Sequence, residues 1–407
     1  MKVDVHSYFS QLGNTIELQW RKSNYDEKVF PGIAQNCLVE NKIHQQISYS
    51  DILYYFGLNN TLDPLQLDQK FGDIQITLYK SEYFFIEALF WMNGTTSIHQ
   101  HAFCGAFTLL HGKSINTEYT FINKTRINAH FYLGELQHKN SILLTTGDIQ
   151  KIDSGDRFIH SVFHLDSPSV TLVIRNHASI DQQPQLSYYP LYVATNGWKK
   201  DLILDKKISA MRLMLDHCKS HGYALLEKFI NIATLYEVFY LFIKINLFTF
   251  ENEWKNKFEM LIRNKEYGNL ILKSLEKKYH SDRLSSLRSF IKDVDQRLFL
   301  AVLMNTPKRK NILNQLQQLF GCRNLQSLEK IVSQFISKIT SVYGVGFKKC
   351  ECIEKIVPIL LKEYSPAQEE KSISELGDQA IAFYYDIQNS FVFKNWFIDY
   401  EKQCATI

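Results

Sequence analysis

The spacing of hydrophobic and polar positions changes twice along the chain. Up to about residue 70, short apolar-periodic segments alternate with polar stretches, which predicts helices and loops. Ser48 and Asp51 precede the apolar run at residues 52–56, so we expect one of them to cap a helix there. From Asp73 the pattern alternates with a period of two, and after about residue 200 it follows the 3.6-residue period of a helix.

The alternating region predicts a series of short β-strands. They recur about every ten residues, and Gly, Asn and Asp occupy the positions between them. The expected strands lie at residues 74–79, 83–91, 107–110, 117–121, 130–133, 141–144, 158–163 and 170–174. Many short strands with turn residues between them are typical of an antiparallel sandwich or barrel.

The last part of the chain predicts a helical domain. Leu204, Ile208, Met211 and Leu215 fall on one helix face, and further helical segments run to about residue 400. Breaks are expected near residues 305–307 and 364–366. A chain of 407 residues is long enough for more than one domain. We therefore predict an α+β multidomain protein with a helical preface over 1–70, a β-barrel over 71–195 and an all-α domain over 200–407.

Composition and charge narrow the class of protein. Hydrophobic residues make up 45% of the chain and charged residues 22%, which is ordinary for a globular protein. The net charge of +4 comes without a dense basic run, so we expect no nucleic-acid partner. No membrane span and no leader are expected, and the seven cysteines show no disulfide-like rhythm. These features predict a soluble, cytoplasmic protein.

A pair of histidines in the alternating region indicates a metal site. His99 and His101 are separated by one residue, so on a strand both side chains lie on the same face. A third histidine from a neighbouring strand would complete a site with open positions. His160 is the candidate; His164 lies on the same strand face about 13 Å further along, at ~3.3 Å per residue, so both cannot bind one ion.

The residues around these histidines resemble the two motifs of the cupin superfamily. The first motif matches His99, His101 and Gly112, with Gly105 where the family usually has a Glu ligand. The second matches His160, with Gly155 two residues further from the histidine than in the family pattern. Within cupins, the likeness over residues 70–176 is to the cysteine dioxygenase (thiol dioxygenase) type, which has three histidines and no carboxylate ligand. This resemblance implies a double-stranded β-helix, with His99, His101 and His160 on Fe(II).

The resemblance leaves the reaction open. Where the family has a Ser-x-His-x-Tyr relay, this chain has residues 171–175 with Val173 and Arg175 in place of the His and Tyr. Lys80 and Arg175 are positional candidates for binding a substrate carboxylate. The leading hypothesis is a non-haem Fe(II) oxygenase for a small molecule, a thiol being one option.

Two other functions compete with the oxygenase. One is a non-oxidative isomerase or lyase that uses Mn, Zn or Ni, with acid–base candidates at Glu87, Glu118 and Tyr119. The other is a ligand-sensing barrel, without enzymatic activity, coupled to a helical interaction domain. The helical half resembles no family that we recognise. Homo-oligomerisation and binding of a protein partner are the two roles considered for it. His217 and His221, four residues apart, are expected on one exposed helix face, and Cys104 is expected to be a structural thiol.

Overall fold

The computed structural model describes the chain in two compact units. The described residues are 4–58, 66, 71–92, 94, 96–177, 184–196, 201–306, 308–321, 324–339, 351–362 and 366–397. One unit comprises residues 1–140 and 144–280, and the other comprises residues 141–143 and 281–407. The boundary between the units therefore falls within the helical region, about 80 residues after the predicted end of the β-barrel. The predicted division into three domains stays a prediction.

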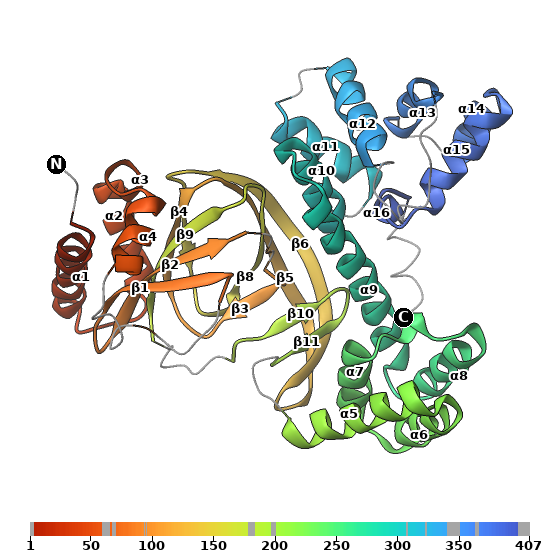
Figure 1. The fold of residues 1–407 in the computed structure, drawn as a ribbon, viewed down its shortest axis with the longest axis horizontal. Helices are drawn as coiled ribbons and strands as arrows, with labels where there is room; N and C mark the ends of the chain where they lie inside the picture. The colour runs from red at the N-terminus through yellow and green to blue at the C-terminus, as the bar shows by residue number, and fades with distance from the viewer. Residues whose placement is uncertain are drawn as a thin grey trace. The chain divides into compact units, whose positions relative to one another are not determined.

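Within the described residues, four α-helices precede the β domain (Figure 1). They are α1 (Val5–Lys22), α2 (Phe30–Asn41), α3 (Ile43–Gln46) and α4 (Tyr49–Leu58). Asp4 caps α1, because its side chain accepts a hydrogen bond from the backbone N–H of His6. Ser48 and Asp51 cap α4 reciprocally, each side-chain oxygen accepting the other residue's backbone N–H, as the sequence predicted.

The β domain consists of two antiparallel sheets. One has the strand order β1-β2-β9-β4-β7, and the other closes in the order β10-β11-β6-β5-β8-β3. The bounds are β1 (Ile74–Lys80), β2 (Phe84–Trp91), β3 (His99–His101), β4 (Gly105–His111), β5 (Lys113–Asn128), β6 (Phe131–Thr145), β7 (Ile149–Ile152), β8 (Gly155–His164), β9 (Ser169–Asn176), β10 (Ser187–Tyr189) and β11 (Val193–Thr195). This confirms the predicted α+β class with an antiparallel β-barrel between helical segments.

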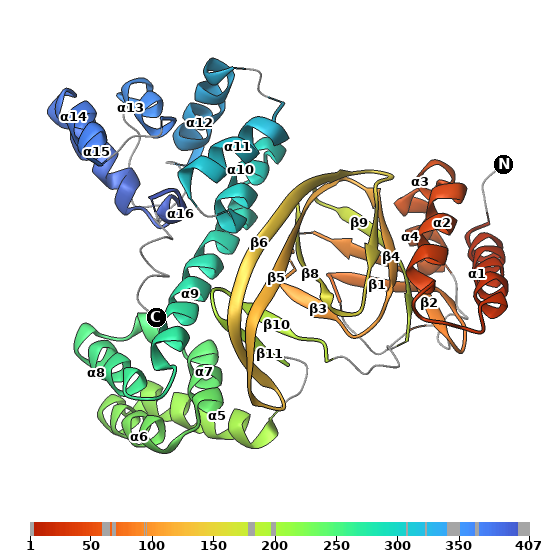
Figure 2. The ribbon, with the colours of Figure 1, turned by 180° about the vertical axis from the view of Figure 1, so that it is seen from behind.

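The N-terminal helices cover the outer face of the first sheet. Phe9, Ile16 and Trp20 of α1 are buried in one core with alternate residues of β2 and β9, among them Ile86 and Leu172. The views from both sides show these helices against the sheet (Figures 1 and 2). Because side chains alternate along a strand, the residues between these core positions, such as Glu87 and Arg175, lie on the opposite face, inside the β domain.

The strand prediction was wrong in one respect. The three short strands expected at 117–121, 130–133 and 141–144 are parts of two long strands, β5 and β6. The alternation continues through polar residues such as Asn123 and Lys124, whose side chains face solvent, so the pattern of hydrophobic residues underestimated the strand length. The sequence also did not predict the three-residue strands β10 and β11.

The helices that follow the β domain form a second hydrophobic core within the first unit. They are α5 (Leu202–His217), α6 (Lys219–Ile232), α7 (Leu235–Lys244), the 3₁₀ helix η2 (Leu247–Thr249), α8 (Asn252–Arg263) and the start of α9 (Gly268–Phe290). Leu204, Ile208 and Met211 are buried, as predicted, with Phe131 of β6 and Val193 of β11. These helices are therefore joined to the barrel by an apolar core.

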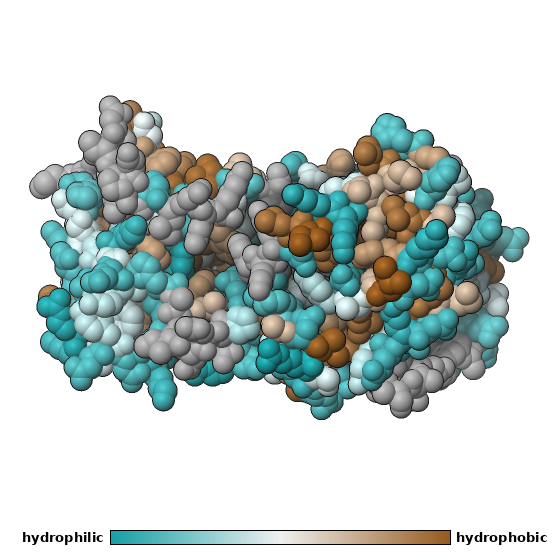
Figure 3. Space-filling model, turned by 90° about the horizontal axis from the view of Figure 1, so that it is seen from below, coloured by the Kyte–Doolittle hydropathy of each residue, from teal (hydrophilic) through white to brown (hydrophobic). Residues whose placement is uncertain are grey.

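The same helices also expose apolar side chains. The exposed residues are Leu202, Ile203, Leu213 and Met214 on α5, Leu225 and Ile232 on α6, and Met260 on α8. Figure 3 shows brown apolar patches between the teal side chains on this part of the molecule. The sequence-based expectation of a homo-oligomer or a protein partner stays a prediction.

The second unit is helical. It contains α10 (Val294–Asn305), α11 (Arg309–Leu319), α12 (Leu325–Ile339), α13 (Ile353–Leu360), α14 (Pro366–Ser374), α15 (Asp378–Asn389) and α16 (Lys394–Phe397), together with the end of α9. Phe299 stacks on Phe335 with ring centroids 4.1 Å apart, and Trp396 is buried beside them. α10 ends at Asn305 and α14 begins at Pro366, near both predicted breaks, although residues 307 and 363–365 lie outside the described residues.

Two further observations bear on the expectations from composition. None of the described helices combines the length and apolar character needed to cross a bilayer. Cys37, Cys104 and Cys218 are free thiols, whereas Cys352 is disulfide-bonded, which the spacing of the cysteines did not predict.

Candidate metal site

Two neighbouring strands bring the three predicted histidines together. His99 of β3 is paired directly with His160 of β8, and Gln100 is paired with Ile159. A bulge follows Gln100, so that His101 is paired with Gly155. Bulges re-aim side chains locally, and here His101 reaches the same place as the other two rings. Each of the three histidines is at most 5% exposed.

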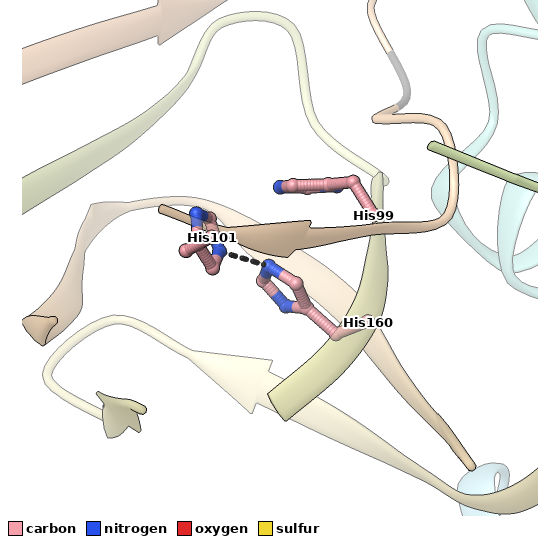
Figure 4. A group of neighbouring side chains, drawn as sticks. All are labelled: His99, His101 and His160. Atoms are coloured by element: carbon pink, nitrogen blue, oxygen red, sulfur yellow. Dashed lines mark hydrogen bonds between the residues drawn. The ribbon is translucent and has the colours of Figure 1, made fainter. Parts of the chain in front are cut away.

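The ring nitrogens of the three histidines converge (Figure 4). One nitrogen of each ring lies within 4.8 Å of one nitrogen of both others. Nε2 of His101 and Nε2 of His160 are 2.9 Å apart. Among the described residues, this is the one group of three or more His, Cys, Asp or Glu side chains with metal-binding geometry. The structure thus brings the three predicted histidines together, and their role as metal ligands stays a prediction.

Hydrogen bonds fix which nitrogen of two rings carries the proton. Nδ1 of His99 lies 2.7 Å from the carbonyl oxygen of Ser97, which can only accept, so Nδ1 donates. Nδ1 of His160 is 2.8 Å from Oδ1 of Asn116 and donates to it. Both rings therefore present the lone pair of Nε2, the usual arrangement in which an outer hydrogen bond orients a metal-binding histidine.

The surroundings keep the histidines neutral. Burial lowers the pKa of His99 below its ordinary value. Burial also lowers the pKa of His160 and His101 well below that value, and the charges of neighbouring histidines and of Arg175 add to the effect on His101. Since a metal binds the neutral imidazole, burial prepares all three rings as ligands.

The residues fit a divalent transition metal. Nε2 of His99 is buried and has no hydrogen-bond partner among the residues that the structure describes, although it carries a lone pair. Two nitrogens bound to one ion at about 2.1 Å and at right angles lie about 3 Å apart, close to the observed separation of His101 and His160. Imidazole nitrogens suit Fe, Ni, Cu and Zn, so this test supports a metal without choosing among them.

Gly105 excludes a fourth ligand at the position where cupins usually have Glu. A Cβ atom added to Gly105 would lie 2.0 Å from the carbonyl oxygen of Ile174 and 2.9 Å from Cα of Arg175. These atoms belong to β9, which is paired with β4 at this point. Because this backbone cannot move without breaking the sheet, no side chain fits at residue 105, and this position cannot supply a ligand.

The two predicted substrate-binding residues lie in different environments. Arg175 is buried, its Nε donates to Oε2 of Glu87 at 2.6 Å, and its guanidinium lies 4.9 Å from the rings of Phe85 and Phe103. The ring of Phe103 in turn lies 4.5 Å from that of His101. Lys80 is the last residue of β1 and is exposed. Arg175 is therefore near the site, whereas Lys80 lies at the surface.

The other residues that the sequence analysis considered for a functional role make structural contacts. Glu118 forms a salt bridge with Lys139, and Tyr119 is buried. Nδ1 of His164 hydrogen-bonds to Oγ of Ser114 at 2.9 Å, and its ring stacks on Trp91; it does not belong to the metal-binding group. Burial raises the pKa of Cys104 to about 12, consistent with a structural thiol.

One expectation about the helical half was wrong. His217 ends α5 and His221 lies in α6, so they do not share one helix face. Cys218 interrupts the helix between them, and its Sγ lies 2.7 Å from Nδ1 of His221.

Sequence reasoning missed the residues that hold the histidines in place. Asn116 bonds His160, and the side chain of Gln100, on the other face of β3, bonds the carbonyl of Pro184 at 2.6 Å and the hydroxyl of Tyr188 at 2.5 Å. The sequence carried a signal for Asn116 and for Gln100, because a buried polar residue within an apolar strand needs a hydrogen-bond partner. The identity of that partner depends on strand pairing, which the sequence does not reveal.

Comparisons with known proteins add little. No family model and no curated protein matches the chain. Solved structures that are similar in part include hydroquinone 1,2-dioxygenase from Sphingomonas sp. TTNP3 with 4-hydroxybenzoate bound, at 13% identity over 28% of this chain and 70% of that chain, with a TM-score of 0.22.

Two further structures are similar at the same level. A hydroquinone 1,2-dioxygenase in complex with Cd²⁺ and 4-hydroxybenzonitrile is 13% identical over 28% of this chain and 69% of its own, with a TM-score of 0.22. A DMSP lyase structure is 14% identical over 26% of this chain and 48% of its own, with a TM-score of 0.19. This chain thus spans about half the length of that lyase. Likenesses at this level carry no argument about function.

Proposed function

We propose that the chain is a metal-dependent enzyme of the cupin type, in which His99, His101 and His160 hold Fe(II), with Mn, Zn or Ni as the alternative ions. The observation that carries this proposal is the convergence of the three buried imidazoles of His99, His101 and His160. Such a ligand set leaves the charge of a divalent ion uncompensated and keeps positions open for other ligands.

We propose further that the reaction is the oxygenation of a small molecule, with a thiol as the first candidate. An Fe(II) ion supplies Lewis acidity and access to dioxygen chemistry. Oxidation of a thiol to a sulfinic acid, RSH + O₂ → RSO₂H, places both oxygen atoms on sulfur and needs no external reductant. The chain's own contribution is three imidazoles, of which His99 and His160 are oriented by outer hydrogen bonds, with the rings of Phe103 and Phe158 beside them.

Arg175 is our candidate for an anionic group of the substrate. Its guanidinium lies inside the β domain, and its charge contributes to lowering the pKa of His101. Glu87 already accepts a hydrogen bond from Nε of Arg175, so a substrate anion would share Arg175 with this carboxylate. The exposed position of Lys80 gives no support to a similar role. A cytoplasmic location and the absence of a nucleic-acid partner stay predictions from the sequence.

Oxygen uptake tests the proposed reaction. Protein purified anaerobically and loaded with Fe(II) is mixed with small thiols that carry a carboxylate, an amine, both or neither, each beside its hydroxyl analogue. We expect uptake of one O₂ per thiol, and none with the hydroxyl analogues or with His160→Ala. Iron-loaded protein without thiol-dependent uptake would contradict a thiol oxygenase. Turnover with Mn, Zn or Ni in the absence of O₂ would favour the isomerase or lyase.

A further inference from the structure

Asn116 occupies an unusual place for its residue type. It lies within β5, opposite Val162 of β8, and is fully buried. Asn is disfavoured in strands, and a buried amide is tolerated only where it has hydrogen-bond partners. A residue that breaks both local preferences points to a functional requirement at its position.

One atom of the Asn116 amide serves a metal ligand. Oδ1 accepts the Nδ1–H of His160 at 2.8 Å. This hydrogen bond keeps the proton on Nδ1 and leaves the lone pair of Nε2 toward His101. It also restricts rotation of the ring, because moving the ring would break the bond. Asn116 thereby selects both the tautomer and the orientation in which His160 can bind a metal.

The other atom of the amide has no acceptor. Nδ2 of Asn116 is buried and makes no hydrogen bond with any residue that the structure describes. An amide nitrogen carries two N–H donors, and leaving buried donors unsatisfied is unfavourable. The oxygen of the same amide is fixed by His160, so the amide cannot turn its nitrogen elsewhere without losing that bond. The donors of Nδ2 are thus available to a bound molecule.

The charges inside the barrel indicate the chemistry of that molecule. The guanidinium of Arg175 is paired with the carboxylate of Glu87, so these two charges balance each other. A divalent ion held by the three histidines would attract an anion, and an anion supplies the acceptor that Nδ2 lacks.

We infer that Asn116 is a positioning residue with two roles: Oδ1 holds His160 as a metal ligand, and Nδ2 donates a hydrogen bond to an anionic small molecule bound beside the metal. This inference rests on the proposed metal site. Asn116 should therefore affect both metal affinity and anion affinity. The substitutions Asn116→Ala and Asn116→Asp separate these two effects.

The first measurement is metal affinity. Asn116→Ala removes both amide groups, whereas Asn116→Asp keeps an oxygen acceptor for Nδ1 of His160. With Co²⁺ as the probe in a chelator competition, we expect Asn116→Ala to bind about 10–100-fold more weakly, as is usual when an outer partner of a ligating histidine is removed. Asn116→Asp should stay within a few-fold of the unmodified protein. Ser114→Ala is the matched control, since Ser114 bonds Nδ1 of His164, which lies outside the metal-binding group.

The second measurement is anion affinity at saturating Co²⁺, with azide as the probe and the visible spectrum as the readout. Both Asn116 variants lack the Nδ2 donors, so we expect each to bind azide at least about fivefold more weakly, the effect of one ordinary hydrogen bond. In Asn116→Ala this loss occurs without any change of charge. Circular dichroism of each variant shows that it is folded.

The outcomes separate the inference from the proposed function. Unchanged Co²⁺ affinity in Asn116→Ala would overturn the role of Oδ1, and unchanged azide affinity in both variants would overturn the role of Nδ2. Failure of the unmodified protein to bind Co²⁺ would instead overturn the metal site itself, and the inference with it.

Discussion

The carboxylate of Glu87 and the guanidinium of Arg175 form a buried ion pair between the adjacent strands β2 and β9, with Oε2 and Nε 2.6 Å apart. Glu87 also accepts a hydrogen bond from Gln75 at 2.7 Å. Two charged groups inside a β domain are stable only as a hydrogen-bonded pair. This pair keeps the wall beside the histidines electrically balanced.

Breaking the Glu87–Arg175 pair should destabilise the protein strongly. Glu87→Ala leaves the buried guanidinium of Arg175 without its carboxylate, and we expect a loss of about 3–5 kcal/mol in the free energy of unfolding. Replacing both residues, as in Glu87→Leu with Arg175→Met, should recover most of this loss. Lys139→Ala, which breaks the more exposed pair with Glu118, should cost about 0–1 kcal/mol. Urea unfolding measures all of these; equal losses in the single and the double variant would contradict the prediction.

The close approach of β9 to Gly105 gives a second prediction. Gly105→Ala places a Cβ atom on the carbonyl of Ile174, so we expect a loss of about 1–3 kcal/mol or more in stability from overpacking against the backbone. Gly32→Ala is the control: Gly32 lies in helix α2 and an added Cβ meets nothing within 4 Å, so it should be neutral or stabilising. Thermal unfolding compares the two. A Gly105→Ala protein as stable as the unmodified one would show that the sheet can widen there.

The side chain of Gln100 gives a third prediction, about the precision of the site. It is fixed at both ends, to Pro184 and to Tyr188, and it lies between the two histidines of β3. Gln100→Leu leaves the buried hydroxyl of Tyr188 and the carbonyl of the half-buried Pro184 without their partner, and we expect metal affinity to fall about 10–100-fold. Tyr188→Phe removes one of the two bonds and should have a smaller effect. Chelator competition measures both. A metal affinity unchanged in Gln100→Leu would mean that strand pairing alone holds β3.

The three free thiols within the described residues should differ in reactivity. Burial raises the pKa of Cys37 and of Cys104 to about 12, so both stay neutral thiols at ordinary pH. The hydrogen bond from His221 lowers the pKa of Cys218, which is more accessible. Because the thiolate is the nucleophile, alkylation with iodoacetamide should modify Cys218 first, and its rate should rise with pH at a lower pH than for an ordinary thiol.

Peptide mass spectrometry of the alkylated protein follows each thiol separately. His221→Ala should shift the pH profile of Cys218 upward and leave Cys104 unchanged. Alkylation of Cys104 as fast as that of Cys218 in the folded protein would contradict the difference in burial.

Much of the site could be predicted because it depends on local periodicity. The two-residue spacing of His99 and His101 determines that they share a strand face, whatever surrounds them. The alternating pattern likewise located most strands, and the 3.6-residue period located α5. These features depend on the periodicity of a single strand or helix, and that periodicity can be read from the order of residues in the sequence.

The remaining features depend on pairing between distant segments. That Oδ1 of Asn116 meets His160, and that Glu87 neutralises Arg175, follow from the register of β5 with β8 and of β2 with β9. The atom that prevents a side chain at residue 105 also belongs to another strand: it is the carbonyl oxygen of Ile174. Strand register is set by the whole sheet, so motifs and residue spacing could not predict these contacts.

The central claim is that His99, His101 and His160 bind one metal ion, and metal content measures it most directly. The protein is purified anaerobically, and its metals are quantified by elemental analysis beside His160→Ala and, as a matched control, His164→Ala, which changes a buried histidine outside the group. We predict about one transition-metal ion per chain in the unmodified protein and in His164→Ala, and little in His160→Ala. Equal, sub-stoichiometric metal in all three proteins would contradict the claim.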